Sequence, residues 1–140
     1  RIKGWTLASA AHPIRGGAIV SRPSRYGNPC KVSLMQEMGY EDPHAAAAEN
    51  FRTWLAGSRS DAPTDEADQR RERILAGLPE LRGKDLACTC RHDQACHADV
   101  LLHRANMPAA ELASWINVVR ARVDRQRAAR GEEPMYAPAV

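Results

Sequence analysis

The sequence predicts a single small α/β domain, in which a short, mainly parallel sheet is flanked by helices and a long amphipathic helix follows near the C-terminal end. Two short apolar segments, 18–20 and 86–90, each lead into a polar loop, and helical periodicity marks much of the remaining chain. The 140 residues suffice for one domain of ordinary size. We expect an α/β core over residues 1–107, with the C-terminal helix and tail, 108–140, packed on the same domain.

The first strand is predicted at 18–20, where an Ala-Ile-Val run combines apolar and β-favouring side chains. It leads into segment 21–29, whose two Pro, one Gly and one Asn are incompatible with regular structure. The second strand is predicted at 86–90, after a polar turn at 82–85. Because only these two strands are clear, we expect the sheet to recruit a third from residues 3–8.

Capping signals and apolar periodicity predict the helices. The first begins with Asp42 as N-cap and Pro43 in the first helical position, and it stops at Gly57. The second is polar, so we expect much of its length to face solvent. This second helix is predicted at 65–76, and two more helices are predicted at 95–106 and 109–130.

Charge is unevenly distributed along this chain of net charge +3. Residues 1–36 contain six bases and no acid, whereas residues 37–81 contain ten acids and five bases. A basic surface of this kind suits an anionic ligand such as a phosphate or a nucleic acid. The alternative is a basic arm that lies on the acidic segment within the same fold.

No apolar run approaches the ~20 residues that a membrane helix requires, and no signal segment opens the chain. We therefore expect a cytoplasmic protein that is not embedded in a membrane. In that setting the four cysteines do not indicate a disulfide framework. Three of them fall within nine residues, which is more typical of metal ligands or reactive thiols.

The strongest chemical signal is the set Cys88, Cys90, Cys96 and His97. Cys88 and Cys90 alternate on the predicted strand and can point to the same side. Cys96 and His97 open the next predicted helix, and Cys₃His is a known donor set for zinc. The set is therefore a candidate zinc site. One argument opposes it: adjacent helical residues point about 100° apart, so Cys96 and His97 share an ion only if the helix starts later.

Two further interpretations of these residues stay open. In the first, a thiol of lowered pKa, at Cys88 or Cys96, acts as a nucleophile. Asp99 or Glu49 would then serve as acid or base, which makes Cys88, Cys96 and Asp99 the candidate catalytic residues. In the second, the thiols are buried structural groups and His97 is a hydrogen-bonding partner. A Cys88–Cys96 disulfide would add a redox role.

Ligands of open α/β sheets bind beyond the carboxyl ends of the strands. If the two strands are parallel neighbours, segment 22–29 (RPSRYGNP) faces the cysteine cluster across one crevice. Guanidinium groups bind phosphate or carboxylate, and an amide both donates and accepts hydrogen bonds. The alternative is a rigid turn whose Asn bonds its own backbone. The predicted ligand-binding residues are Arg22, Arg25, Asn28 and Lys84.

Five segments carry a family resemblance: KGW at 3–5, RPSRYGNP at 22–29, Trp54-Leu55, LRGKDL at 81–86 with Cys88 and Cys90, and CHADVLL at 96–102. Together they resemble an uncharacterised family of bacteria and their phages, domain-of-unknown-function family 4326, over about residues 3–106. Cys30 departs from the pattern, which expects an aromatic, and so does Thr89, where Trp is common. The Cys-His helix start is also similar to a second uncharacterised family, which has an acid in place of Cys90 and so weakens the case for this ligand.

The resemblance implies no activity, so the functional hypotheses rest on the residues. The leading hypothesis is a protein that binds, and in one version processes, a nucleotide or nucleic-acid component in the crevice between the RPSRYGNP loop and the cysteine cluster. The alternative is a non-enzymatic module, zinc-stabilised or thiol-rich, that binds nucleic acid or a partner protein. The residues leave open whether the protein is an enzyme and which oligomeric state it adopts.

Overall fold

The computed structural model describes residues 17–88, 90–91 and 93–137, and it confirms a small α/β fold. Strand β1 (Gly17–Ile19) pairs in parallel with β2 (Asp85–Ala87), with Ile19 opposite Ala87. The Val20 backbone N–H donates to the Ala87 carbonyl at 2.9 Å, which extends the pairing by one residue. The third strand expected from residues 3–8 lies outside the described residues.

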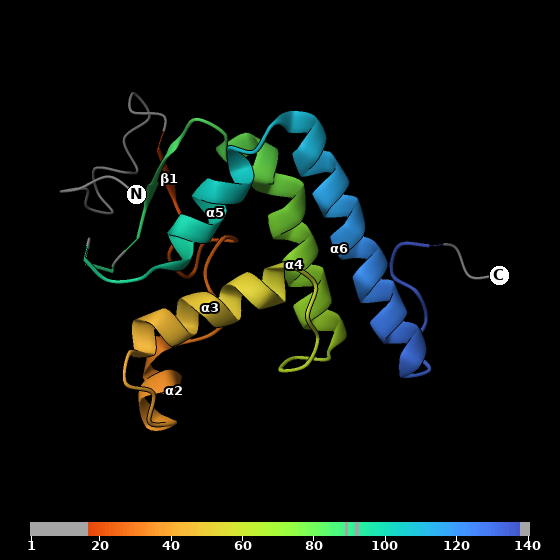
Figure 1. Ribbon diagram of the computed structural model, residues 1–140, viewed down its shortest axis with the longest axis horizontal. Helices are drawn as coiled ribbons and strands as arrows, with labels where there is room; N and C mark the ends of the chain where they lie inside the picture. Colours follow the sequence, from red (N-terminus) through yellow and green to blue (C-terminus); the bar gives the residue numbers. More distant parts are fainter. Residues whose placement is uncertain (1–16, 89, 92, 138–140) are drawn as a thin grey trace.

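All four predicted helices are present, and Figure 1 shows α6 running alongside α4. A short helix, α2 (Val32–Glu37), was not predicted, because Met35 is its one buried residue and no apolar period can be read from the sequence. None of the helices that the structure describes is long and apolar enough to span a membrane. The predicted helices are α3 (Pro43–Leu55), α4 (Asp65–Gly77), α5 (His97–Ala105) and α6 (Ala109–Ala129), with a 3-10 turn, η2 (Leu78–Leu81), after α4.

Local signals explain where α3 begins and ends. The Asp42 carboxylate accepts a hydrogen bond from the backbone N–H of Ala45 at 3.0 Å, which satisfies one of the unpaired donors of the first turn. Gly57 has a φ of +107°, a left-handed conformation that L side chains rarely adopt. Both features lie where the sequence predicts them.

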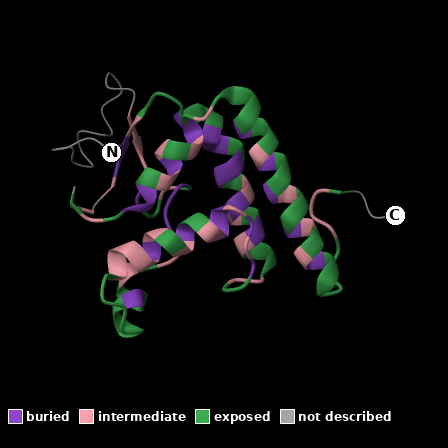
Figure 2. Ribbon diagram, viewed as in Figure 1, coloured by how far each residue is buried: buried purple, intermediate pink, exposed green. Residues whose placement is uncertain are grey.

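The core forms between α4 and the facing sides of α3, α5 and α6 (Figure 2). Aromatic and aliphatic side chains of α3 and α4 are fully buried there, together with the β2 residue Leu86. Helix α6 contributes one stripe to the same core, and its other faces are largely exposed. The α6 residues in the core are Leu112, Ile116 and Val119.

A buried ion cluster joins α4, α6 and the loop after α3. Asp68 is fully buried and accepts hydrogen bonds from Arg59 at 3.0 Å, from Arg71 at 2.9 Å and from Arg127 at 2.8 Å. Burial alone would raise the pKa of Asp68, but the bonds from the guanidinium groups outweigh it and lower that pKa. The polar side of α4 therefore does not simply face solvent as predicted, because α6 covers part of it.

Candidate metal centre

The candidate metal centre lies at the carboxyl end of the parallel strand pair. Because the strands are parallel, the loops that follow β1 and β2 leave the same edge of the sheet. Strand β2 ends at Ala87, so Cys88 and Cys90 lie in the loop after the strand and do not alternate on it as predicted. Cys96 is the N-cap of α5 and His97 is its first residue.

Three donor atoms of the cluster lie close enough together to hold one metal ion. The ligand atoms of Cys88, Cys96 and His97 all lie within 4.8 Å of one another. The Sγ atoms of Cys88 and Cys90 are 3.7 Å apart, as are Cys96 Sγ and His97 Nδ1. Zn–S bonds of ~2.3 Å in tetrahedral geometry place two sulfur ligands about 3.8 Å from each other. The donor atoms of Cys88, Cys96 and His97 can therefore reach one ion of this size.

Hydrogen bonds fix the tautomer of His97, which is only 6% exposed. Its Nε2 lies 2.7 Å from the carbonyl oxygen of Val20 and 3.1 Å from that of Tyr26. Carbonyl oxygens only accept, so Nε2 carries the proton and donates to both. An edge-to-face contact with the Phe51 ring holds the plane of the His97 ring, and the two ring centroids are 5.1 Å apart. In the neutral ring this tautomer makes Nδ1, which lies 3.7 Å from Cys96 Sγ, the nitrogen that can bind a metal.

The start of α5 removes the geometric objection to a shared ion. Cys96 has a φ of −145° and a ψ of 143°, an extended conformation, and the helix begins only at His97. This start is two residues later than predicted. Since the two residues are not consecutive on a helix, their side chains are free of the 100° separation that helical geometry imposes, and their donor atoms converge.

The pKa values of two thiols in the cluster shift in opposite directions. Hydrogen bonds from Cys90 and then Cys96 hold the pKa of Cys88 well below its usual value. Hydrogen bonds with Cys88 and Cys90, together with burial, raise the pKa of Cys96. A thiolate at Cys88, solvated by neighbouring thiols, gives the cluster an anionic centre to which a cation is attracted. All four cysteines are free thiols.

A crevice of about 260 Å³ adjoins the cluster. Arg22 lies at this crevice and donates to the Asn28 carbonyl at 2.6 Å, and it has no carboxylate partner among the described residues. Ser21 Oγ and His44 Nδ1 are buried and lack a hydrogen-bond partner within the described part of the chain. Unsatisfied buried polar atoms are uncommon in folded proteins, so a ligand atom is one explanation for this pair. The crevice is lined by Ser21, Arg22, Asn28, Cys30, Val32, His44 and Ala47 together with Cys88, Cys90, Cys96 and His97.

Asn28 is positioned by the fold itself. Its Nδ2 donates to the Ala47 carbonyl at 3.0 Å, and its Oδ1 accepts from the Cys30 backbone N–H at 2.9 Å. The side chain is buried and both of its polar ends are engaged. Asn28 thus ties the loop after β1 to α3 and orients the wall of the crevice, which agrees with the rigid-turn alternative.

Four other candidate residues do not converge on the crevice. Arg25 turns away and pairs with Glu80 at 3.2 Å. Lys84 is exposed just before β2, at the opposite end of the sheet. Asp99 is exposed in the first turn of α5 and does not line the crevice. Glu49 lies on the exposed side of α3, paired with an arginine one turn along, and borders a different cavity.

Two of the crevice residues that the sequence did not predict, Ser21 and His44, have buried polar atoms without partners among the described residues. Ser21 directly follows the first predicted strand, so its place at a strand carboxyl end was a usable signal. His44, in the first turn of α3, gave none, because its approach to the crevice depends on how α3 packs against the loop after β1.

Comparison with known proteins bears on the family alone. A family model described as Domain of unknown function (DUF4326) matches residues 7–107, well over half of the chain. No curated protein and no solved structure matches the chain. The matched region contains both strands, helices α2 to α5 and the whole candidate metal centre. The chain therefore belongs to the DUF4326 family.

Proposed function

We propose that the protein is a zinc-binding domain whose metal centre borders a binding site for the phosphate group of a nucleotide or nucleic acid. The convergence of Cys88 Sγ, Cys96 Sγ and His97 Nδ1 within 4.8 Å carries the proposal for the metal. Thiolate and imidazole ligands in tetrahedral arrangement select zinc, whereas magnesium and calcium prefer oxygen ligands.

Cys90 is the fourth ligand in this proposal. Its Sγ lies 3.7 Å from that of Cys88, the separation expected for two ligands of one zinc ion. A closed set of four protein ligands is typical of structural zinc, so the function is binding rather than hydrolysis. Without Cys90 the set has three ligands, and an open position would let zinc activate a water molecule for hydrolysis. This enzymatic version is the second candidate, favoured by the three-residue grouping that excludes Cys90.

The first prediction is about one zinc ion per chain in untagged protein, measured by elemental analysis together with a count of reactive thiols. Cys30→Ser is the matched control, because Cys30 lines the same crevice outside the cluster, and it should leave the zinc content unchanged. Cys88→Ser should lose the metal. Cys90→Ser decides between closed and open coordination: loss of zinc supports four ligands, and retained zinc supports three. Metal-free wild-type protein with four reactive thiols would overturn the proposal.

The phosphate site rests on the polar atoms of the crevice. The guanidinium of Arg22 lacks a carboxylate partner in the described chain, and Ser21 and His44 bring polar atoms without partners. Charge-assisted bonds from guanidinium groups to phosphate are strong and bidentate. A crevice of about 260 Å³ suits a phosphate with part of its sugar rather than a complete nucleotide.

The second prediction concerns Arg22→Gln, for which we expect about tenfold weaker binding of a short 5′-phosphorylated oligothymidylate, because a hydrogen bond to a charged group is worth ~1.5–3 kcal/mol. Fluorescence anisotropy measures this affinity. Arg25→Gln removes the same charge from the same loop, but its guanidinium pairs with Glu80 away from the crevice, so it should change the affinity little. Equal losses in the two variants would show non-specific charge attraction and contradict the site.

A further inference from the structure

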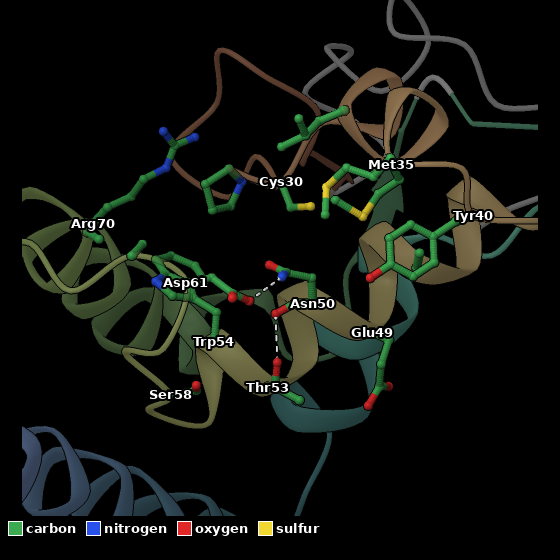
Figure 3. Close-up of a pocket in the computed structure, with 16 residues that line it drawn as sticks. Cys30, Met35, Tyr40, Glu49, Asn50, Thr53, Trp54, Ser58, Asp61 and Arg70 are labelled. Atoms are coloured by element: carbon green, nitrogen blue, oxygen red, sulfur yellow. Dashed lines mark hydrogen bonds between the residues drawn. The ribbon is translucent and has the colours of Figure 1, made fainter.

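A second cavity, which shares Cys30 with the crevice, has a volume of about 560 Å³ and is not used by the proposed function. It lies between α2, α3, α4 and the loop that joins α3 to α4. Small-molecule sites commonly fall between ~300 and 1,000 Å³. In Figure 3, Cys30 and Met35 face Asn50 and Asp61 across this cavity, with Tyr40 toward one end and Arg70 toward the other.

One wall of the cavity is apolar and flexible. Leu34, Met38 and Tyr40, on and just after α2, are among the most exposed large apolar side chains of the described residues. Met35 of the same helix is buried beside them. Thioethers adapt their shape and pack well on aromatic rings, and tyrosine stacks on flat rings. This wall suits a flat ring system.

The opposite wall offers two acceptors side by side. Asn50 Nδ2 donates to Asp61 Oδ2 at 2.8 Å, which leaves the amide oxygen of Asn50 and the second carboxylate oxygen of Asp61 without donors among the described residues. Two neighbouring acceptors require a ligand edge with two neighbouring donors. Guanine has such an edge in its N1–H and 2-amino groups, whereas adenine presents the acceptor atom N1 in that position.

Trp54 provides a second indication that a ligand binds in this cavity. Its side chain is 5% exposed and lines the same cavity, and its indole N–H has no hydrogen-bond partner among the described residues. Donors of this kind are rarely left unpaired when buried. A ring with several acceptor atoms, seated in the cavity, is a source of such a partner.

The guanidinium group of Arg70 lies at the remaining side of the cavity. Arg70 donates to the Gly27 carbonyl at 3.3 Å and has no carboxylate partner in the described part of the chain. Burial, and then the nearby charges of Arg22 and Arg73, lower its pKa. A phosphate on the ligand would neutralise this charge.

We propose that this cavity binds a guanine nucleotide. The base would lie against the apolar wall at α2, its donor edge on Asp61 and Asn50, and the phosphate toward Arg70. The site is distinct from the crevice at the metal centre and does not depend on a metal ion. The Asp61 carboxylate can accept a hydrogen bond from guanine N1–H. With adenine it would face N1, which is also an acceptor, so the site favours guanine over adenine.

Isothermal titration of the metal-loaded protein with GMP, AMP and guanosine tests this assignment. We expect GMP to bind at least tenfold more tightly than AMP, and Asp61→Asn to remove this preference. Arg70→Gln should weaken GMP at least tenfold and leave guanosine nearly unchanged. Arg73→Gln is the matched control, since it removes the same charge from the same helix at an exposed position that does not line the cavity, and it should weaken GMP binding far less than Arg70→Gln.

The assignment would be overturned by no GMP binding at millimolar concentration, by equal binding of GMP and AMP, or by a preference that survives Asp61→Asn. GMP binding that is lost in Arg22→Gln but not in Arg70→Gln would also overturn it, because the nucleotide would then occupy the crevice. That last result would support the proposed phosphate site, so the two proposals fail separately.

Discussion

Cys88→Ser is expected to lower the melting temperature by about 10 °C and to abolish zinc binding. A ligand at a thousandfold excess over its dissociation constant adds ~4 kcal/mol of stability, and each kcal/mol shifts the melting temperature by roughly 2–4 °C in a domain near this size. A metal ion in this centre would connect the end of β2 to α5. The hydrogen bonds of His97 to the carbonyl oxygens of Val20 and Tyr26 connect α5 in turn to the loop after β1. Two strands of three residues cannot supply this connection alone.

A chelator makes this prediction specific to the metal. Treatment of the wild-type protein with a zinc chelator should produce the same fall in melting temperature, measured by circular dichroism, and should have no effect on Cys88→Ser. Cys30→Ser should respond to the chelator as the wild type does. If Cys88→Ser is destabilised and the chelator leaves the wild type unchanged, the cluster stabilises the fold as buried thiols and the zinc assignment is wrong.

Asp68→Asn is expected to cost about 3–5 kcal/mol of unfolding free energy, the usual effect of removing one partner from a buried ion pair. The substitution keeps the shape of the side chain but removes its charge. Arg59 and Arg71 are 2% and 0% exposed, so their guanidinium groups would stay buried without the carboxylate that accepts their bonds. Urea unfolding followed by circular dichroism measures the change.

Asp65→Asn is the matched control for Asp68. Asp65 lies on the same helix and contacts Arg127 at 2.8 Å, but its side chain is 69% exposed. Solvent screens such a pair, so we expect only a small change in stability. If the two variants lose similar free energy, the buried network contributes no more than a surface ion pair.

The helix boundaries could be predicted because their causes are local. The cap at Asp42 and the left-handed Gly57 act on neighbouring backbone atoms, so the sequence alone places the limits of α3. The apolar repeat of α6 likewise needs only helical spacing. Helix α2 could not be predicted because it lacks such a local signal. Met35 is its one buried residue, so the sequence shows no apolar repeat, and contacts with α3 hold the helix in place.

The sequence by itself also predicted the candidate metal ligands, because Cys88, Cys90, Cys96 and His97 fall within ten residues around one strand-to-helix loop. Only the tertiary structure shows how their side chains are arranged. The proton of His97 is placed by carbonyls more than seventy positions away, and the late start of α5 lets Cys96 turn toward the same point.

The same division holds for the candidate ligand-binding residues. Arg22 and Arg25 are equivalent in the sequence, and their different partners separate them: one lines the crevice and the other pairs with Glu80. The guanidinium groups around Asp68 also come from three separate stretches of the chain. Capping and periodicity act over a few residues and are legible in the sequence, whereas burial, tautomer and charge pairing depend on groups that only folding brings together.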